Sequence, residues 1–146
     1  MIRKISRNDR DAYLHMAHDF YHSPAVLHPI PEKHIIDTFE QLITSGPYIE
    51  GYVFETNGKC SGYALICQTY SQEAGGLVVW LDEFYVDPKF RGQGIGSEFL
   101  DYIEKHIPAA RYRLEIEPEN IRAEALYVSK GYEKLPYVQY VKEQHK

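Results

Sequence analysis

The sequence predicts an α+β fold built around one mixed sheet. Some segments place apolar residues at every second position, which indicates strands, and others place them at helical spacing. These segments follow one another in the order β-α-α-β-β-β-α-β-α-β, with no repeat or low-complexity linker between them. A chain of 146 residues suits one core, so we expect residues 1–146 to form a single domain.

The N-terminal third is predicted to hold a strand and two helices. Residues 1–6 form the strand, and Asn8 or Asp9 is placed to cap a helix that runs to about Tyr21. A proline-bearing loop follows, and Pro31 opens the second helix. The apolar residues of that helix form one stripe at helical spacing, made by Ile35, Ile36, Phe39, Leu42 and Ile43.

The remainder is predicted to alternate between strands and two further helices. Residues 48–55 and 60–70 flank Asn57-Gly58, a strong hairpin signal, and residues 77–86 form a third long strand. Later segments are assigned as a helix from the glycine stretch to about Ile107, a strand over 111–117, a helix over 120–129 that ends at Gly131, and a last strand over 137–143.

Composition excludes several classes of protein. The net charge is −5 and basic residues form no run, which argues against a nucleic-acid partner and is compatible with a cationic small substrate. No apolar run approaches the roughly 18 residues of a membrane helix, and the polar N-terminus does not resemble a signal peptide. Cys60 and Cys67 would stand roughly 23 Å apart along one strand, too far for a disulfide. We therefore expect a cytoplasmic protein without membrane contact.

The stretch VDPKFRGQGIGSEF, residues 86–99, indicates a phosphate site. It fails the dinucleotide fingerprint, because Ser97 stands where the third glycine belongs, and it lacks the lysine of a P-loop. It fits R-x-x-G-x-G through Arg91, Gly94 and Gly96, between the end of a strand and the first turn of a helix. Free N–H groups and the helix dipole favour an anion there, and glycine lets the backbone approach a pyrophosphate.

Two blocks of the sequence resemble the GNAT superfamily of N-acetyltransferases. LDEFYVDPKFRGQGIGSEFLDYIEKH contains the superfamily signature [QR]-x-x-G-x-[GA], and EPENIRAEALYVSKGYEKL contains N-x-x-A-x-x-[LF]-Y-x-x-x-G-[FY]. The resemblance covers essentially the whole chain. It implies a mostly antiparallel central sheet flanked by about four helices, and acetyl-CoA (coenzyme A) as the acyl donor without a metal.

The resemblance also implies which residues hold the donor. The backbone from Gln93 to Gly96 would cradle the pyrophosphate, the strand end would pair with the pantetheine arm, and the N–H of Val86 would stabilise the oxyanion. Asn120 has two interpretations, a helix cap and a contact to pantetheine. The expected donor site comprises Tyr85, Val86, Arg91, Gly92, Gln93, Gly94, Ile95, Gly96, Ser97 and Asn120.

Three residues are candidates for the chemistry. Tyr127 occupies the position of the superfamily's tyrosine, which would protonate the departing thiolate, although a core role is the alternative. Asp82 and Glu83 are nearly equal candidates for the base that deprotonates the amine, and we expect them to point to opposite faces of the sheet. Water alone is the alternative to both.

The sequence leads to the hypothesis of direct acetyl transfer to a small-molecule amine by a monomer or homodimer. The acceptor stays open between a polyamine-like, an aminoglycoside-like and an amino-acid amine. A non-catalytic acyl-CoA sensor or interaction protein and a protein N-terminal or lysine acetyltransferase are the alternatives. Tyr21, Tyr70 and Tyr137 are candidates for lining the acceptor pocket. The helical face shared by His15, His18 and His22 is expected to be solvated rather than metal-binding.

Overall fold

The computed structural model describes residues 1–144, and it confirms the α+β class with one mixed sheet. The strands lie in the order β1-β2-β3-β4-β5, antiparallel from β1 to β4, while β5 is parallel to β4. The elements are β1 (Ile2–Lys4), α1 (Arg10–Tyr21), α2 (Glu32–Ile43), β2 (Glu50–Thr56), β3 (Lys59–Ser71), β4 (Gly76–Val86), α3 (Ile95–His106), β5 (Arg111–Leu114) and α4 (Ile121–Ser129). Within residues 1–144 no helix is both long and apolar enough to span a membrane.

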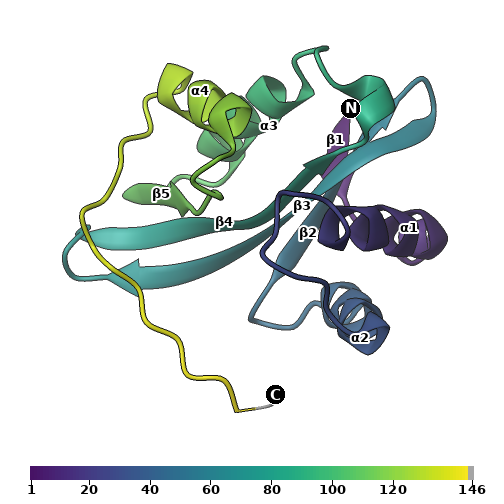
Figure 1. Ribbon diagram of the computed structural model, residues 1–146, viewed down its shortest axis with the longest axis horizontal. Coiled ribbons are helices and arrows are strands. Elements are labelled where there is room, and N and C mark those ends of the chain that lie inside the picture. Colours follow the sequence, from purple (N-terminus) through teal and green to yellow (C-terminus); the bar gives the residue numbers. More distant parts are fainter. Residues whose placement is uncertain (145–146) are drawn as a thin grey trace.

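The sheet separates two pairs of helices, as Figure 1 shows. Helices α1 and α2 cover one face, where their apolar stripes pack on β2, β3 and β4 around Tyr13, Phe39 and Tyr63. Helices α3 and α4 cover the other face and pack around Phe54, Phe99 and Ile103. Helix α2 buries Ile35, Phe39 and Leu42 of the stripe that its periodicity predicts.

The hairpin, the start of α3 and the end of α4 form as predicted. Asn57 and Gly58 adopt φ values of 53° and 76°, the positive pair that a two-residue hairpin turn requires. The β2–β3 ladder continues directly from this turn. Helix α3 begins after Gly94, inside the glycine stretch, and α4 is followed by Gly131 with φ 90°.

The cap of α1 differs from the prediction. Asp9 is the residue before the helix, but its side chain makes no hydrogen bond to a helical N–H. Its carboxylate instead accepts from the backbone N–H of Ser6, 2.7 Å away, and from both terminal nitrogens of Arg3 at 2.8 Å. A short 3-10 turn over Arg7–Asp9 places the carboxylate there, so Asp9 ties β1 to the start of α1.

One strand prediction is too long and another is wrong. The strand expected over 111–117 forms as β5 but ends at Leu114, because β4 pairs with β5 only from Val78 to Leu81 and then diverges from it. The strand expected over 137–143 does not form. The chain leaves α4 and runs past the β3–β4 turn, away from the sheet edge (Figure 1). Side chains hold this segment there: the Tyr137 hydroxyl donates to Glu73, and Gln139 donates to Glu115 at 2.8 Å.

Candidate active site

A β-bulge in β4 opens the candidate site. Leu65 of β3 pairs with Glu83 and Ile66 pairs with Leu81, so Asp82 is the extra residue of β4. The pairing of β4 with β5 ends at Leu81, immediately before this bulge. The two strands therefore separate, and between them lies a cavity of about 870 Å³ that also reaches the N-terminal ends of α3 and α4.

The bulge corrects the expected directions of Asp82 and Glu83. Strict alternation would send them to opposite faces, but Leu81 and Phe84 both pack in the cluster under α3 and α4. The two residues between them are therefore on the side of α1. Burial raises the pKa of Tyr13 and Tyr21 on that helix, and the charges of both carboxylates add to the rise. Both carboxylates line the cavity.

The glycine stretch forms one wall of the cavity. Gly94 is the residue before α3 and adopts φ 81°, a left-handed conformation that costs a residue with a Cβ about 1–2 kcal/mol. A Cβ built on Gly94 would meet no atom within 4 Å, so the cradle faces open space. The Arg91 Nε donates to the carbonyl of Val86 at 2.8 Å and fixes the loop against the end of β4.

The backbone of Val86 faces the cavity. The N–H of Asp87 donates to the carbonyl of Ser61 at 2.8 Å, which closes the ladder with β3. In an antiparallel ladder successive residues alternate, so the N–H of Val86 points to the opposite side, where β5 has diverged. An N–H in this position is available to a carbonyl oxygen in the cavity.

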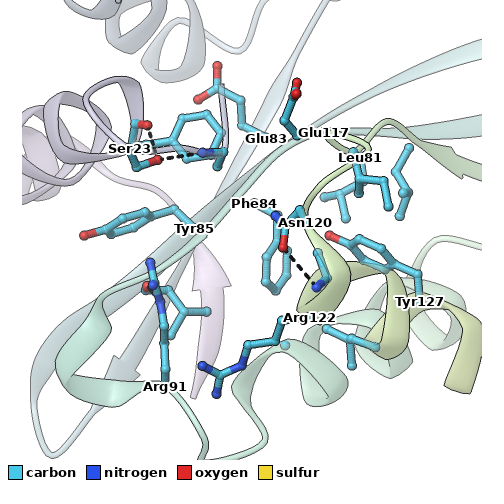
Figure 2. A pocket seen from close by; sticks show the side chains of 18 of the residues that line it. Ser23, Leu81, Glu83, Phe84, Tyr85, Arg91, Glu117, Asn120, Arg122 and Tyr127 are labelled. Atoms are coloured by element: carbon cyan, nitrogen blue, oxygen red, sulfur yellow. Dashed lines mark hydrogen bonds between the residues drawn. The ribbon is translucent and has the colours of Figure 1, made fainter. Parts of the chain in front are cut away.

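Helix α4 contributes the third wall. The Asn120 side chain accepts from the N–H of Ala123 at 3.1 Å, which confirms its cap role. Tyr127 lies two turns further along the helix, is 8% exposed, and directs its hydroxyl toward the cavity (Figure 2). Burial raises the pKa of Tyr127 to about 12, so its hydroxyl stays protonated throughout the neutral range.

The cavity is electrostatically divided. Figure 2 shows Arg91 and Arg122 at one end, Glu83 and Glu117 at the other, and Tyr85, Phe84 and Tyr127 between them. Further carboxylates among the lining residues are those of Asp82, Glu115 and Glu119. One end therefore favours anions and the other favours cations.

The two carboxylates of β4, Asp82 and Glu83, differ in their surroundings. Glu83 is half-buried, and burial raises its pKa, while hydrogen bonds from Tyr21 and Tyr63 offset part of the rise. Asp82 is more exposed, and its pKa is raised by partial desolvation in the cavity and by the nearby charge of Glu115. Both pKa values move toward neutral pH, where a base works best.

The structure gathers all but one of the residues singled out from the sequence. Of the thirteen candidate catalytic and donor-binding residues, every one except Gln93 lines the cavity. Tyr70 and Tyr137 do not line it, since they lie near the β3–β4 turn, while Tyr21 reaches it only through Glu83.

Sequence reasoning missed Arg122 and the three glutamates that follow β5. A cation in the first turn of the helix after Asn120, opposite the glycine stretch, is a signal that could have identified Arg122. The glutamates depend on how the end of β5 is placed in space.

Comparison with known proteins agrees with this geometry. Residues 11–132 match the Acetyltransferase (GNAT) family. A spermine/spermidine N(1)-acetyltransferase from Bacillus subtilis (strain 168) is 29% identical over 82 residues, 52% of this chain and 54% of the relative. A thialysine N-epsilon-acetyltransferase from Sus scrofa is 33% identical over 81 residues, 53% of this chain and 47% of the relative. The chain thus spans about half the length of these curated relatives.

Solved structures share the fold. A possible acetyltransferase from Clostridium difficile 630 has a TM-score of 0.83 at 21% identity, over 98% of this chain and 96% of that one. AAC(6′)-Iy in complex with a CoA-containing bisubstrate analogue has a TM-score of 0.80 at 14% identity, over 99% and 97% of the two chains. With the family match extending over most of the sequence, this chain belongs to the GNAT family of acetyltransferases.

Proposed function

We propose that this protein is an acetyl-CoA-dependent N-acetyltransferase that moves acetyl directly to a primary amine of a small, positively charged molecule. One observation carries the proposal: a single cavity joins an anion-binding end to an acidic end, with the end of β4 and Tyr127 between them. Cys60 and Cys67 are outside its lining, which favours direct transfer over an acetyl-cysteine intermediate.

The anion-binding end fits the phosphates of CoA. The left-handed Gly94 leaves the first N–H groups of α3 facing open space, and Arg91 and Arg122 add positive charge. The free edge of β4 beyond Leu81 offers backbone groups to the pantetheine arm. Acetyl-CoA supplies the acetyl group as a thioester, whose carbonyl oxygen the N–H of Val86 would hold.

The acidic end fits a cationic acceptor. Glu83 and Glu117 lie at this end, and the carboxylates of Asp82, Glu115 and Glu119 also line the cavity. One relative is named for spermine and spermidine and another for thialysine, and all three molecules are amines. These observations support a polyamine-like acceptor over an uncharged one.

The transfer needs a balanced movement of protons. The amine nitrogen forms a bond to the thioester carbon, and the C–S bond breaks. One proton must leave the ammonium first, because an alkyl amine has a pKa of about 10.4 and is mostly protonated at neutral pH. Glu83 is positioned to take that proton, directly or through one water, since it lines the acidic end and has a raised pKa. Tyr127 would give its proton to the departing thiolate, and the second proton, which the nitrogen loses as it becomes an amide, would restore the Tyr127 hydroxyl.

The test is turnover on an amine panel. The purified protein is incubated with acetyl-CoA and spermidine, thialysine, an aminoglycoside or a lysine peptide, and free thiol is measured. We expect turnover to be fastest with the polyamine. Tyr127→Phe should lower kcat roughly 10²-fold, in the range of a lost general acid. Tyr132→Phe is the matched control, because Tyr132 packs beside Tyr127 with ring centroids 5.8 Å apart but does not line the cavity.

Two outcomes would overturn this proposal. Tight CoA binding without turnover on any amine would indicate an acyl-CoA sensor. Turnover confined to the lysine peptide would indicate a protein acetyltransferase.

A further inference from the structure

Glu83 is held by two tyrosine hydroxyls from different elements. Tyr21, the last residue of α1, donates to Oε2, and Tyr63 of β3 donates to Oε1 at 2.8 Å. Each carboxylate oxygen thus has its own donor. A carboxylate fixed at both oxygens keeps one rotamer and one orientation toward the cavity.

Within the protein, these two hydroxyls are the groups that donate hydrogen bonds to the Glu83 carboxylate. Tyr63 is fully buried, with its ring 5.1 Å from that of Tyr13 and 5.8 Å from that of Tyr85. The charged neighbour is Asp82, which opposes ionisation, and Tyr13 and Tyr21 face it from α1. Among the salt bridges of residues 1–144, none involves Glu83.

Tyr21 also connects Glu83 to the acceptor side of the cavity. It does not itself line the cavity, but it directly precedes the α1–α2 loop, whose residues 23–27 do. Its ring packs edge-on against Phe20, 5.1 Å away, and Phe20 is part of the lining. The hydroxyl of Tyr21 therefore joins the start of this loop to β4.

We propose that Tyr21 is a positioning residue for the base: through its hydroxyl, which donates to Oε2, it orients the Glu83 carboxylate toward the acceptor amine. This rests on the proposed function, in which Glu83 receives the ammonium proton. Tyr63 gives the same support from β3, while Tyr21 gives it from the C-terminal end of α1, directly before the α1–α2 loop.

The expected effect has a defined sign. A hydrogen bond to the ionised form lowers a carboxyl pKa, so removing the Tyr21 hydroxyl raises the pKa of Glu83. The base must be ionised to act, so the acidic limb of the pH profile of kcat/KM moves to higher pH. Losing one hydrogen bond to an ionised carboxylate corresponds to a shift of about one unit in the pKa of that group.

The experiment measures kcat/KM for spermidine against pH in the full-length protein. In Tyr21→Phe the acidic limb should move up by about one unit, while the maximum stays within about threefold of wild type. Tyr13→Phe is the matched control: Tyr13 lies on the same helix and in the same cluster, but its hydroxyl makes no hydrogen bond to Glu83, so the limb should not move. A direct titration of the Glu83 carboxyl by NMR should show the same shift without turnover.

Different results separate the possible failures. If Tyr21→Phe lowers kcat/KM equally at every pH and leaves the NMR midpoint unchanged, Tyr21 is only structural and this inference is wrong. If Glu83→Gln keeps the wild-type limb, Glu83 is not the base, and the inference fails although the transferase function stands. If wild type turns over no amine, the proposed function fails, and a shifted NMR midpoint would then show only that Tyr21 sets the ionisation of Glu83.

Discussion

At the scale of single residues, Gly62 sets how closely β3 approaches the end of β4. A Cβ built there would lie 2.2 Å from the carbonyl oxygen of Tyr85, 2.8 Å from Cδ2 of Phe54 and 3.1 Å from Cα of Val86. Two of these atoms belong to the backbone and cannot move without shifting the end of β4, which lines the cavity. The absence of a side chain at Gly62 is therefore required by the site as well as by the core.

We expect Gly62→Ala to lower the free energy of unfolding by about 2–3 kcal/mol, the range of an overpacked core. The displaced Val86 should also lower kcat/KM. Urea unfolding and thiol release measure the two effects. Gly76→Ala is the control, because its Cβ would meet only the Cβ of Ala110 at 3.2 Å, and it should cost less than about 1 kcal/mol. Equal stability of Gly62→Ala and wild type would contradict the close approach.

At the scale of elements, the ion pair of Asp9 joins β1 to the start of α1. Asp9 is 5% exposed, and hydrogen bonds from Arg3 and Ser6 hold its pKa below the ordinary range. Because the folded-state pKa is lower than the unfolded value of about 3.9, the stabilisation is complete above about pH 5 and is lost as the pH falls through the unfolded value toward the folded one.

Asp9→Asn should therefore destabilise the protein by about 2–3 kcal/mol at pH 7, since it leaves Arg3 without its main partner. The difference from wild type should shrink as the pH is lowered toward 3, where wild type loses the same interaction. Urea unfolding at several pH values measures this. Asp37→Asn, which breaks the exposed pair with Lys33, should cost less than about 0.5 kcal/mol. A pH-independent difference for Asp9→Asn would contradict the assignment.

The elements that the sequence predicted well carry their signal locally. The stripe of α2, the Asn57-Gly58 turn and the start of α3 each follow from neighbouring residues. The bulge at Asp82 does not, because it is a property of the pairing of β3 with β4. Val78 and Val79 are adjacent and both are buried, so the sequence of β4 shows no strict alternation of apolar and polar residues from which the bulge could be located. The pattern therefore located both carboxylates and misjudged their directions.

At the scale of the whole molecule, the site exists because the sheet divides at one place. Strand β4 stays paired with β3 along its length, but its pairing with β5 ends at Leu81. Helices α3 and α4 contribute the residues that line the cavity beyond this point. The residues proposed to bind the donor come from α3, α4 and the end of β4, which the motifs identify. The residues proposed to face the acceptor come from two loops that only the assembled fold brings together.

The C-terminal segment shows the limit of pattern reasoning at this scale. Tyr137, Val138, Tyr140 and Val141 have strand-forming side chains, yet all are more than 60% exposed and the segment is not part of the sheet. Strand propensity describes side chains, whereas a strand also needs a partner backbone, and nothing local specifies one. The segment is held instead by the hydrogen bonds of Tyr137 and Gln139.

A proline substitution tests whether this segment contributes to the sheet. Proline lacks the N–H that a ladder requires, so Val138→Pro should cost less than about 0.5 kcal/mol in urea unfolding if residue 138 is unpaired. Val53→Pro, in the paired and buried part of β2, is the matched control and should abolish folding. A loss of more than about 2 kcal/mol for Val138→Pro would show that the segment pairs as the strand its sequence suggests. That result would require a sixth strand at a free edge of the sheet, beside β1 or β5.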